Sequence, residues 1–520
     1  MAVILLLALA LVLVCYCALH RHKLADIYLR PLLKNTLLED FYHAELIQPE
    51  APKRRRRGIW DIPGPKRILG TKWIFLLFFR RYKMTKLHEV YALNRQYGDI
   101  VLEVMPSNVP IVHLYNRDDL EKVLKYPSKY PFPPTEIIVM YRQSRPDRYA
   151  SVGIVNEQGP MWQRLRSSLT SSITSPRVLQ NFLPALNAVC DDFTELLRAR
   201  DTLVVPNFEE LANLMGLAVC TLMLGRRMGF LAIDTKQPQK ISQLAAAVKQ
   251  LFISQRDSYY GLGLWKTKTY RDFARAEDLI YDVISEIIDH ELEELKKSAA
   301  CEDDEAAGLR SIFLNILELK DLDIRDKKSA IIDFIAAGIE NTLLFVLSSV
   351  TGDPGAMPRI LSEFCEYRDT NILQDALTNA TYTKACIQES YRLRPTAFCL
   401  ARILEEDMEL SGYSLNVVLC QNMIACHKDS NFQGAKQFTP ERWIDPATEN
   451  FTVNVDNASI VVPFGVGRRS CPGKRFVEME VLAKMVLAFD VSFVKPLETE
   501  FEFLLAPKTP LSLRLSDRVF

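Results

Sequence analysis

The stretch Phe464-Gly-Val-Gly-Arg-Arg-Ser-Cys-Pro-Gly473 constrains the fold and chemistry of this chain more tightly than any other. It places Cys471 among Gly465, Gly467 and Gly473, which lack side chains and let backbone amides approach the sulfur and hold it as a thiolate. A single axial thiolate suits haem iron, whereas zinc needs three or four ligands at short spacing. No Cys-x-x-Cys or His-Glu-x-x-His pattern occurs in the chain. For an isolated Cys-Pro-Gly, a small buried cysteine in a turn would be the commoner interpretation.

The whole run has the pattern Phe-x-x-Gly-x-Arg-x-Cys-x-Gly, which resembles the haem-binding signature of the cytochrome P450 superfamily. The similarity extends from about Pro63 to the C-terminus. It implies a mainly α-helical fold with a minor β-sheet region, in which haem b lies between a long central helix and the proximal cysteine loop. It also implies that Cys471 is the axial iron ligand, that Phe464 shields the sulfur, and that Arg469 pairs with a haem propionate through parallel hydrogen bonds.

A second pair of residues resembles the propionate contacts of this family. Trp162 and Arg166 are four residues apart on a predicted helix, so both side chains lie on one face. By themselves they are equally compatible with a core tryptophan beside a surface arginine. The resemblance implies that both contact haem propionates, and that Arg402 does so too.

The motif Glu389-Ser-Tyr-Arg392 places a carboxylate and a guanidinium on one helix face. Alone this is a weak signal, because surface pairs of this kind contribute only about 0.2–0.5 kcal/mol. Together with Phe438-Thr-Pro-Glu-Arg-Trp443 it resembles a buried network of Glu389, Arg392 and Arg442. The implied role is structural support for the haem side of the core.

The run Ala336-Ala-Gly-Ile-Glu340 lies in an apolar helical segment, where a glycine and a carboxylate both need a reason. The resemblance implies that Gly338 leaves room for dioxygen, and that Glu340 and a neighbouring hydroxyl deliver protons through water. The family pattern has threonine directly after the acid. This chain has Asn341 and then Thr342, which turns the hydroxyl by about 100° around the helix axis.

Two further segments are shorter than the family pattern. The stretch after Gly412-Tyr413 reaches Val417 without the usual small-residue turn, and the helix after Cys471 is abbreviated. Deletions inside helices rotate every downstream side chain around the axis. We therefore expect that a few residues of the family pattern are absent from this chain.

The N-terminus predicts three regions. An apolar run over 2–19 is long enough to span a bilayer, so residues 1–23 are expected to form a membrane anchor or targeting segment. A cleaved signal peptide is disfavoured, because the basic residues follow the apolar run. Residues 24–60, which contain four successive arginines, are expected to form a basic linker that is solvated or touches anionic lipid. Residues 61–520, beginning at a segment that resembles the family's Pro-rich hinge, are expected to form the haem-thiolate domain.

The domain has a clear order of predicted elements. A helix at 86–97 and strands at 100–105 and 109–114 come first, and the region 158–350 is almost entirely helical. Short strands and loops return after Pro395, with one helix after Cys471. The resemblance places a substrate cavity among 335–339, 396–400 and 505–511. Gln255 and Tyr259 are candidates for polar contacts with the substrate, and each is equally compatible with a surface position.

The composition limits the partners. Lys and Arg together number 64, as do Asp and Glu, so the chain has no bulk attraction to nucleic acid. The 11 cysteines are scattered without a disulfide framework, which favours a reducing compartment.

Local charge points to a redox partner. Arg468, Lys474 and Arg475 make the surroundings of Cys471 basic, which would steer an acidic protein to this face. This resembles the mitochondrial branch of the family, which takes electrons from an adrenodoxin-like ferredoxin and its NADPH reductase. The apolar N-terminus is instead typical of an endoplasmic-reticulum anchor. We expect a mitochondrial membrane location, because the basic residues around Cys471 and the basic linker both favour it over the endoplasmic reticulum.

Within that branch the chain resembles the insect ecdysteroid hydroxylases, which implies that one oxygen atom of O₂ is inserted into a steroid C–H bond. Another steroid or lipid is an alternative substrate. A haem-thiolate isomerase that needs no electron donor is a second alternative, and a membrane-tethered haem protein that binds a ligand without turnover is a third.

Overall fold

The computed structural model describes residues 58–65, 84–104, 110–126, 135–173, 176–200, 203–221, 227, 229–231, 239–258, 268–298, 316–317, 319–338, 342–368, 370–453, 455–456, 458–475 and 478–518. The expected anchor, residues 1–23, lies outside the described residues. So does the expected linker over 24–60, apart from its last three residues.

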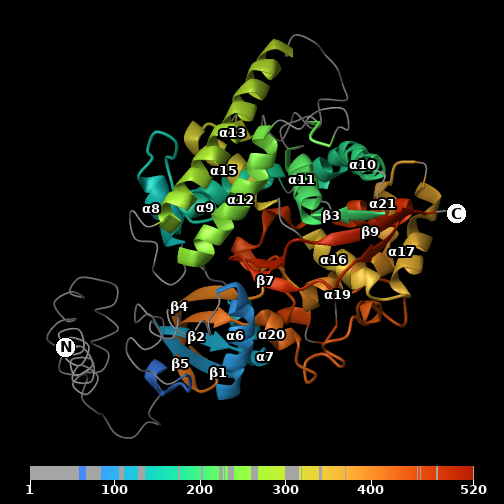
Figure 1. The fold of residues 1–520 in the computed structure, drawn as a ribbon. Helices are drawn as coiled ribbons and strands as arrows, with labels where there is room; N and C mark the ends of the chain where they lie inside the picture. The colour runs from blue at the N-terminus through green and yellow to red at the C-terminus, as the bar shows by residue number, and fades with distance from the viewer. Residues whose placement is uncertain are drawn as a thin grey trace, which may run out of the picture.

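A four-stranded sheet joins the N-terminal and C-terminal parts of the chain (Figure 1). Its order is β1 (Ile100–Val104), β2 (Pro110–Leu114), β5 (Tyr413–Cys420) and β4 (Leu400–Leu410). The pairing of β1 with β2 and of β4 with β5 is antiparallel, and β2 runs parallel to β5. The two early strands predicted from β-branched residues are therefore confirmed, and β2 also pairs with β5, about 300 residues further along.

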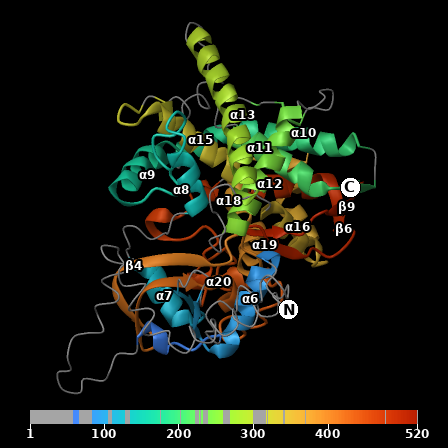
Figure 2. The ribbon, with the colours of Figure 1, turned by 60° about the vertical axis from the view of Figure 1, so that its left-hand side comes forward.

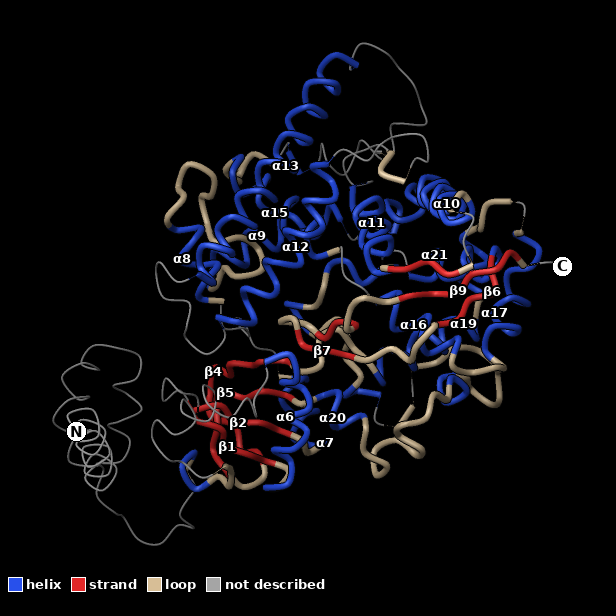
Figure 3. The backbone as a smooth tube through the Cα atoms, in the orientation of Figure 1, coloured by secondary structure: helices blue, strands red, loops and turns tan. Residues whose placement is uncertain are grey.

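Helices form most of the rest of the described chain (Figure 3). They are α6 (Leu87–Asn94), α7 (Arg117–Lys125), α8 (Glu136–Gln143), α9 (Gly159–Ile173), α10 (Pro176–Arg198), α11 (Phe208–Thr221), α12 (Gln239–Ser258), α13 (Lys268–Ser298), α15 (Ile324–Ala337), α16 (Thr342–Thr351), α17 (Ala356–Phe364), α18 (Gln374–Asn379), α19 (Thr381–Leu393), α20 (Asn422–Cys426) and α21 (Glu478–Ala488). Both views place α8, α9, α13 and α15 in the body opposite the four-stranded sheet (Figure 2). The mainly α fold with a minor sheet region is confirmed.

Among its described residues, the predicted all-helical middle of the chain contains one strand. The short β3 (Val204–Pro206) pairs antiparallel with β9 (Ser512–Asp517), which also pairs with β6 (Phe489–Phe493). Local pattern did not reveal β3, because three residues carry no periodicity and their partner lies at the end of the chain. A hairpin of β7 (Thr499–Phe501) and β8 (Leu505–Pro507) precedes β9.

The apolar helical segment expected around Ala336 appears as α15, and α16 follows it in the chain. Helix α15 begins where the Asp323 side chain accepts a hydrogen bond from the Arg325 amide at 2.8 Å, a regular N-cap. Within the described chain, Ile324–Thr351 is also the one stretch long and apolar enough to cross a membrane by composition, with a mean hydropathy of 1.8. Residues such as Ile335 and Phe345 are completely buried in the protein core, so this composition reflects packing inside the fold.

Candidate haem-thiolate site

The cysteine loop is shaped by two of the three glycines that the sequence singled out. Gly465 and Gly467 have φ angles of 68° and 77°, in the left-handed region where a side chain is unfavourable. The Cys471 amide donates to the Phe464 carbonyl at 2.8 Å, which closes the loop. The Phe464 ring packs edge-on against Tyr391 of α19, with ring centroids 5.2 Å apart. The loop is thus anchored to α19 and presents an exposed Cys471.

Gly473 lies between the cysteine loop and the central helix. A Cβ placed on Gly473 would lie 3.7 Å from the Cys471 sulfur and 4.0 Å from Cζ of Phe334 in α15. A side chain at this position would contact both the sulfur and the helix. The glycine therefore leaves one side of the sulfur free of its own side chain, and the loop faces the helix that the resemblance implies.

Three arginines from distant segments reach the cysteine loop. A terminal nitrogen of Arg166, in α9, donates to the Ser470 carbonyl at 2.5 Å, and one of Arg402, in β4, donates to the Val466 carbonyl at 3.5 Å. Arg469, in the loop itself, donates to the Val155 carbonyl at 3.0 Å and to the Glu157 carbonyl. The sequence-predicted propionate residues are therefore brought together in space, and we name Arg166, Arg402 and Arg469 the arginine cluster.

The electrostatics of this cluster are unfavourable without a ligand. Burial lowers the pKa of Arg166 and of Arg402. Burial, followed by repulsion from Arg166, lowers the pKa of Arg469 to about 10. Within the part of the chain that the structure describes, none of the three forms an ion pair with a carboxylate, and the Arg469 Nε is buried without a hydrogen-bond partner.

Trp162 stabilises the cluster from α9. Its side chain is only 2% exposed, and the Arg469 guanidinium lies 4.3 Å from the centre of its ring. This cation–π contact compensates part of the charge, since the ring face is electron-rich. The resemblance implies a propionate contact for Trp162, and the structure shows that Trp162 also contacts Arg469 directly.

The arrangement fits a haem group. Buried cations are normally paired with an anion, and this cluster has none among the described residues. Haem carries two carboxylates, for which guanidinium groups are well suited, and an iron that accepts a thiolate. Cys471, the glycine-opened side of its sulfur and the unpaired Nε of Arg469 are the observations on which this fit depends.

A second charged cluster, by contrast, is complete within the protein. Glu389 and Arg392 in α19 have fully buried side chains, and Arg392 donates to both carboxylate oxygens of Glu389 at 2.9 and 2.8 Å. Arg442 donates to Glu389 at 3.0 Å. Two donors that the sequence did not assign, the Thr439 amide at 3.0 Å and the Trp443 indole at 2.8 Å, complete the shell. We name these residues the Glu389 cluster.

A third cluster positions the central helix and was missed from the sequence. Arg142 of α8 donates to Asp333 of α15 at 2.6 and 3.1 Å and to Glu277 of α13 at 2.9 Å. It also donates to the Ser329 hydroxyl of α15 at 3.2 Å. The sequence feature that could have revealed this cluster is Asp333, an acidic residue among apolar neighbours in α15. A carboxylate in such a position requires a buried partner.

The remaining predicted residues are located only in part. Gly338 caps α15, and its amide donates to the Phe334 and Ile335 carbonyls at 3.2 Å. Glu340 lies outside the described residues, and Thr342 is the half-buried first residue of α16. Arg468 is exposed beside Cys471. The backbone of Lys474 and Arg475 forms a turn after the cysteine, but the positions of their side chains are not described.

Of the two polar residues expected to contact the substrate, the structure describes only Gln255. Gln255 of α12 is only 3% exposed, and Tyr259 lies outside the described residues. Part of the expected cavity lining is in contact, because the Leu505 amide donates to the Thr396 carbonyl at 2.8 Å. The 505–511 segment and the 396–400 segment are therefore neighbours, as the sequence predicted.

Comparison with known proteins identifies the relatives of this chain. The cytochrome P450 family model matches residues 63–514. Ecdysone 20-monooxygenase of Drosophila melanogaster is 96% identical over 540 positions, which cover 100% of both chains. This alignment exceeds the 520 residues of the present chain by 20, so at least 20 positions of that relative have no counterpart here. This agrees with the expectation that residues of the family pattern are absent from this chain, and their places after Gly412-Tyr413 and Cys471 stay predictions.

More distant relatives are mitochondrial proteins of the same family. Mitochondrial cytochrome P450 302a1 of Drosophila melanogaster is 27% identical, covering 81% of this chain and 86% of that protein. The probable mitochondrial cytochrome P450 12a5 of the same organism is 27% identical, covering 84% and 87%. The family match over most of the domain and the near-identity over the full length agree with the cysteine loop and the arginine cluster: this chain belongs to the cytochrome P450 family.

Proposed function

We propose that this protein is a haem-thiolate monooxygenase that hydroxylates ecdysone at C20 and so forms 20-hydroxyecdysone. The observation that carries the proposal is the 96% identity to ecdysone 20-monooxygenase across both full chains. A steroid-hydroxylating enzyme needs a site for haem beside a thiolate, and the cysteine loop with its arginine cluster supports such a site.

The cofactor follows from family membership, which gives a haem iron with a cysteine thiolate ligand. The finer proposal is haem b with Cys471 as the ligand, and with the arginine cluster and Trp162 around its propionates. When bound, thiolate-ligated haem supplies the chemistry that activates O₂ and transfers one oxygen atom to a C–H bond. Phe464 would cover the loop beside the sulfur and limit access of water to it.

The residues of the central helix would handle protons. Gly338 ends α15, and its lack of a side chain would leave room for dioxygen. The carboxylate of Glu340 and the hydroxyl of Thr342 would hold and pass protons through water. Thr342 is the first residue of α16 and thus lies at the same junction as Gly338.

Electron supply would come from a partner. The mitochondrial relatives support a ferredoxin-type donor with its NADPH reductase and a mitochondrial membrane location, with the endoplasmic reticulum as the alternative. Arg468 is exposed next to Cys471 and would contribute, with Lys474 and Arg475, to a basic docking surface for an acidic ferredoxin.

The test combines a spectrum with reconstituted turnover. We expect the dithionite-reduced, CO-bound protein to show the strongly red-shifted Soret band of thiolate-ligated haem, and ecdysone to be converted only with NADPH, reductase and ferredoxin. Cys471→His should retain part of the haem but lose turnover, because imidazole lacks the electron donation of a thiolate.

Each alternative predicts a different outcome of this test. Product formed without any electron donor would favour an isomerase, and ecdysone binding without product would favour a ligand-binding protein. Full hydroxylation by the Cys471→His variant would contradict the assignment of Cys471 as the ligand.

A further inference from the structure

The network around Arg142 extends to the segment that precedes α9. The side chain of Arg142 is only 4% exposed, and each of its nitrogens donates a hydrogen bond. Besides its bonds to α13 and α15, its Nη1 donates to the Val152 carbonyl at 3.2 Å. The guanidinium therefore joins the segment over 151–157 to α15. We name the side chains at its centre the Arg142 cluster: Arg142, Glu277, Ser329 and Asp333.

Gly153 is the point at which this segment packs on the cluster. Its φ angle is 86°, and a Cβ placed on it would lie 2.0 Å from Nη1 of Arg142 and 2.7 Å from Oδ2 of Asp333. Both distances are far shorter than the contact distance of nonbonded atoms, so a residue with a side chain does not fit here. The Gly153 carbonyl accepts from the amides of Asn156 and Glu157 at 3.2 and 2.9 Å, so the chain turns directly on the guanidinium.

The turn ends at the backbone groups that hold the arginine cluster. Arg469 donates to the Val155 carbonyl at 3.0 Å and to the Glu157 carbonyl. Helix α9 begins at Gly159 and carries Arg166. A shift of this segment would therefore move the acceptors of one clustered arginine and the start of the helix that carries another.

The contacts with α15 hold the segment in place. The Ser151 hydroxyl donates to the Asp326 carboxylate at 2.6 Å. The contact of Arg142 with Asp333 has two parallel hydrogen bonds between opposite charges, and such a pair fixes direction as well as distance. Arg142 thus provides the attachment with a defined orientation between α15 and the turn.

We propose that Arg142 is a positioning residue for haem: by fixing the 151–157 segment against α15, it places the Arg469 guanidinium where a propionate binds. The inference rests on the proposed function, because it takes haem as the anion of the arginine cluster. A side chain that is positioned before its ligand arrives loses less conformational freedom on binding. Displacement of Arg142 should therefore weaken the hold on haem, and it should do so through Arg469.

The first experiment displaces Arg142 without changing any charge. In Gly153→Ala, the added methyl group would collide with Arg142, and haem should transfer to apomyoglobin about 3- to 30-fold faster, the range for residues that act on a site through others. The matched control is Gly159→Ala, because Gly159 also has a positive φ, 64°, but its Cβ would have no atom within 4 Å. This control should release haem within about 2-fold of the normal rate. Equal rates in the two variants would overturn the inference.

The second experiment removes Arg142 without leaving a buried charge. Arg142→Met alone would leave two carboxylates without a cation, so it is combined with Glu277→Gln and Asp333→Asn. Replacing a buried charged network by neutral groups of similar size is often tolerated, so the haem-free protein should unfold near the normal urea concentration. Haem release should again be about 3- to 30-fold faster. Reduced stability of the haem-free protein with a normal rate of haem release would assign the cluster to the fold and overturn the inference.

The third experiment adds Arg469→Met to this triple variant. If Arg142 acts through Arg469, the combined variant should release haem within about 2-fold of the rate of Arg469→Met alone. Accelerations that multiply would instead mean that Arg142 acts independently of Arg469, and would overturn the inference.

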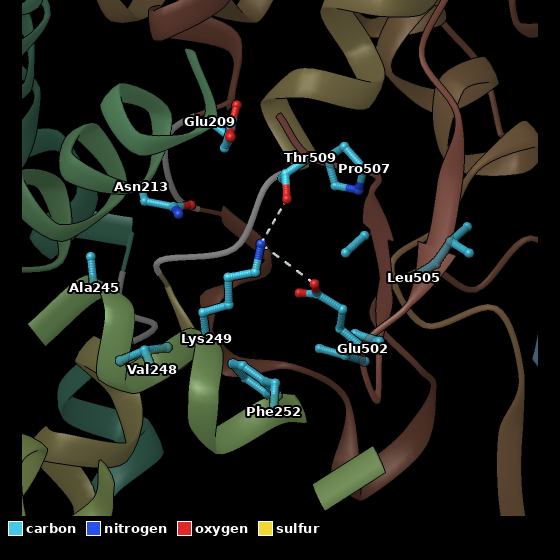
Figure 4. A pocket seen from close by; sticks show the side chains of 12 residues that line it. Glu209, Asn213, Ala245, Val248, Lys249, Phe252, Glu502, Leu505, Pro507 and Thr509 are labelled. Carbon is cyan, nitrogen blue, oxygen red and sulfur yellow. Dashed lines mark hydrogen bonds and ion pairs between the residues drawn. The ribbon is translucent and has the colours of Figure 1, made fainter. Parts of the chain in front are cut away.

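An ion pair elsewhere in the protein provides a further control. Lys249 of α12 lies 3.5 Å from the Glu502 carboxylate and donates to the Thr509 hydroxyl at 3.1 Å, in a pocket beside the β7–β8 hairpin (Figure 4). Lys249→Met combined with Glu502→Gln should release haem within about 2-fold of the normal rate. Faster release in this variant would show that any lost ion pair loosens haem, and would overturn the inference. An unmodified protein that binds no haem would overturn the proposed function as well.

Discussion

The Glu389 cluster and the arginine cluster both hold arginines inside the protein, but they satisfy them in opposite ways. In the Glu389 cluster one carboxylate accepts five hydrogen bonds, all from groups of this chain. In the arginine cluster the guanidinium groups contact backbone carbonyls and the Trp162 ring, with no carboxylate among the described residues. Folding alone neutralises the buried arginines of the Glu389 cluster. The arginine cluster needs an anionic ligand to neutralise its charge.

This difference assigns the Glu389 cluster to the stability of the fold and the arginine cluster to the binding of an anionic ligand. A buried ion pair that lacks one member is strongly destabilising, because the remaining charge has lost both water and its partner. A cluster of like charges that is retained without such a partner lowers the stability of the empty protein and raises its affinity for an anion. The comparison therefore predicts that variants in the two clusters affect different measurements.

The largest effect is expected for Glu389→Gln. All five groups that bond to Glu389 are N–H donors, so the amide nitrogen of glutamine would face at least one of them, and Arg392 would remain buried without an anion. The unfolding free energy of the haem-free protein should fall by about 3–5 kcal/mol, measured by urea denaturation. Glu441→Gln is the matched control, because Glu441 is an exposed partner of Arg359 and should cost less than about 1 kcal/mol. A small loss in both variants would show that the cluster does not support the core.

The sequence predicted three of the five residues of the Glu389 cluster. The spacing of Glu389 and Arg392 on one helix follows from local periodicity, and the resemblance added Arg442. The Thr439 amide and the Trp443 indole were not assigned, because their contact with Glu389 depends on the packing of the short helix Pro440–Trp443 against α19. Side-chain partners that come from another element leave no local pattern.

The haem site shows a similar limit. The glycines and Cys471 could be found in one motif, because a left-handed turn and a thiolate require particular residues at fixed positions. The network around Arg142 could not, because it joins α8, α13 and α15 through side chains 135 and 191 positions apart. The strand β3 was missed for the same reason, since its pairing with β9 is its main stabilisation.

Arg469→Met tests the arginine cluster, because it should change the binding of haem but not the stability of the haem-free protein. The variant removes a half-buried cation that has no anionic partner among the described groups, so the haem-free protein should keep its unfolding free energy within about 1 kcal/mol. Haem should dissociate about 10- to 100-fold faster in transfer to apomyoglobin, since charged hydrogen bonds to a propionate are lost. Arg468→Met, the exposed neighbour, should release haem at the normal rate. A large loss of stability in the empty protein would instead assign Arg469 to the support of the loop.

The smallest effect concerns the contact between Trp162 and Arg469. Trp162→Phe keeps an aromatic ring beneath the guanidinium but weakens its electron-rich face, and it also leaves unfilled volume in a buried position. Trp162→Phe is therefore measured both alone and in the Arg469→Met background. The cost of the unfilled volume is the same in both measurements, so it cancels in the difference. The remaining coupling energy should be about 0.5–1 kcal/mol in urea denaturation of the haem-free protein, where the ring is the main compensation for the charge. A coupling of zero would mean that the backbone carbonyls alone hold Arg469, and that Trp162 contributes to this site only through its packing.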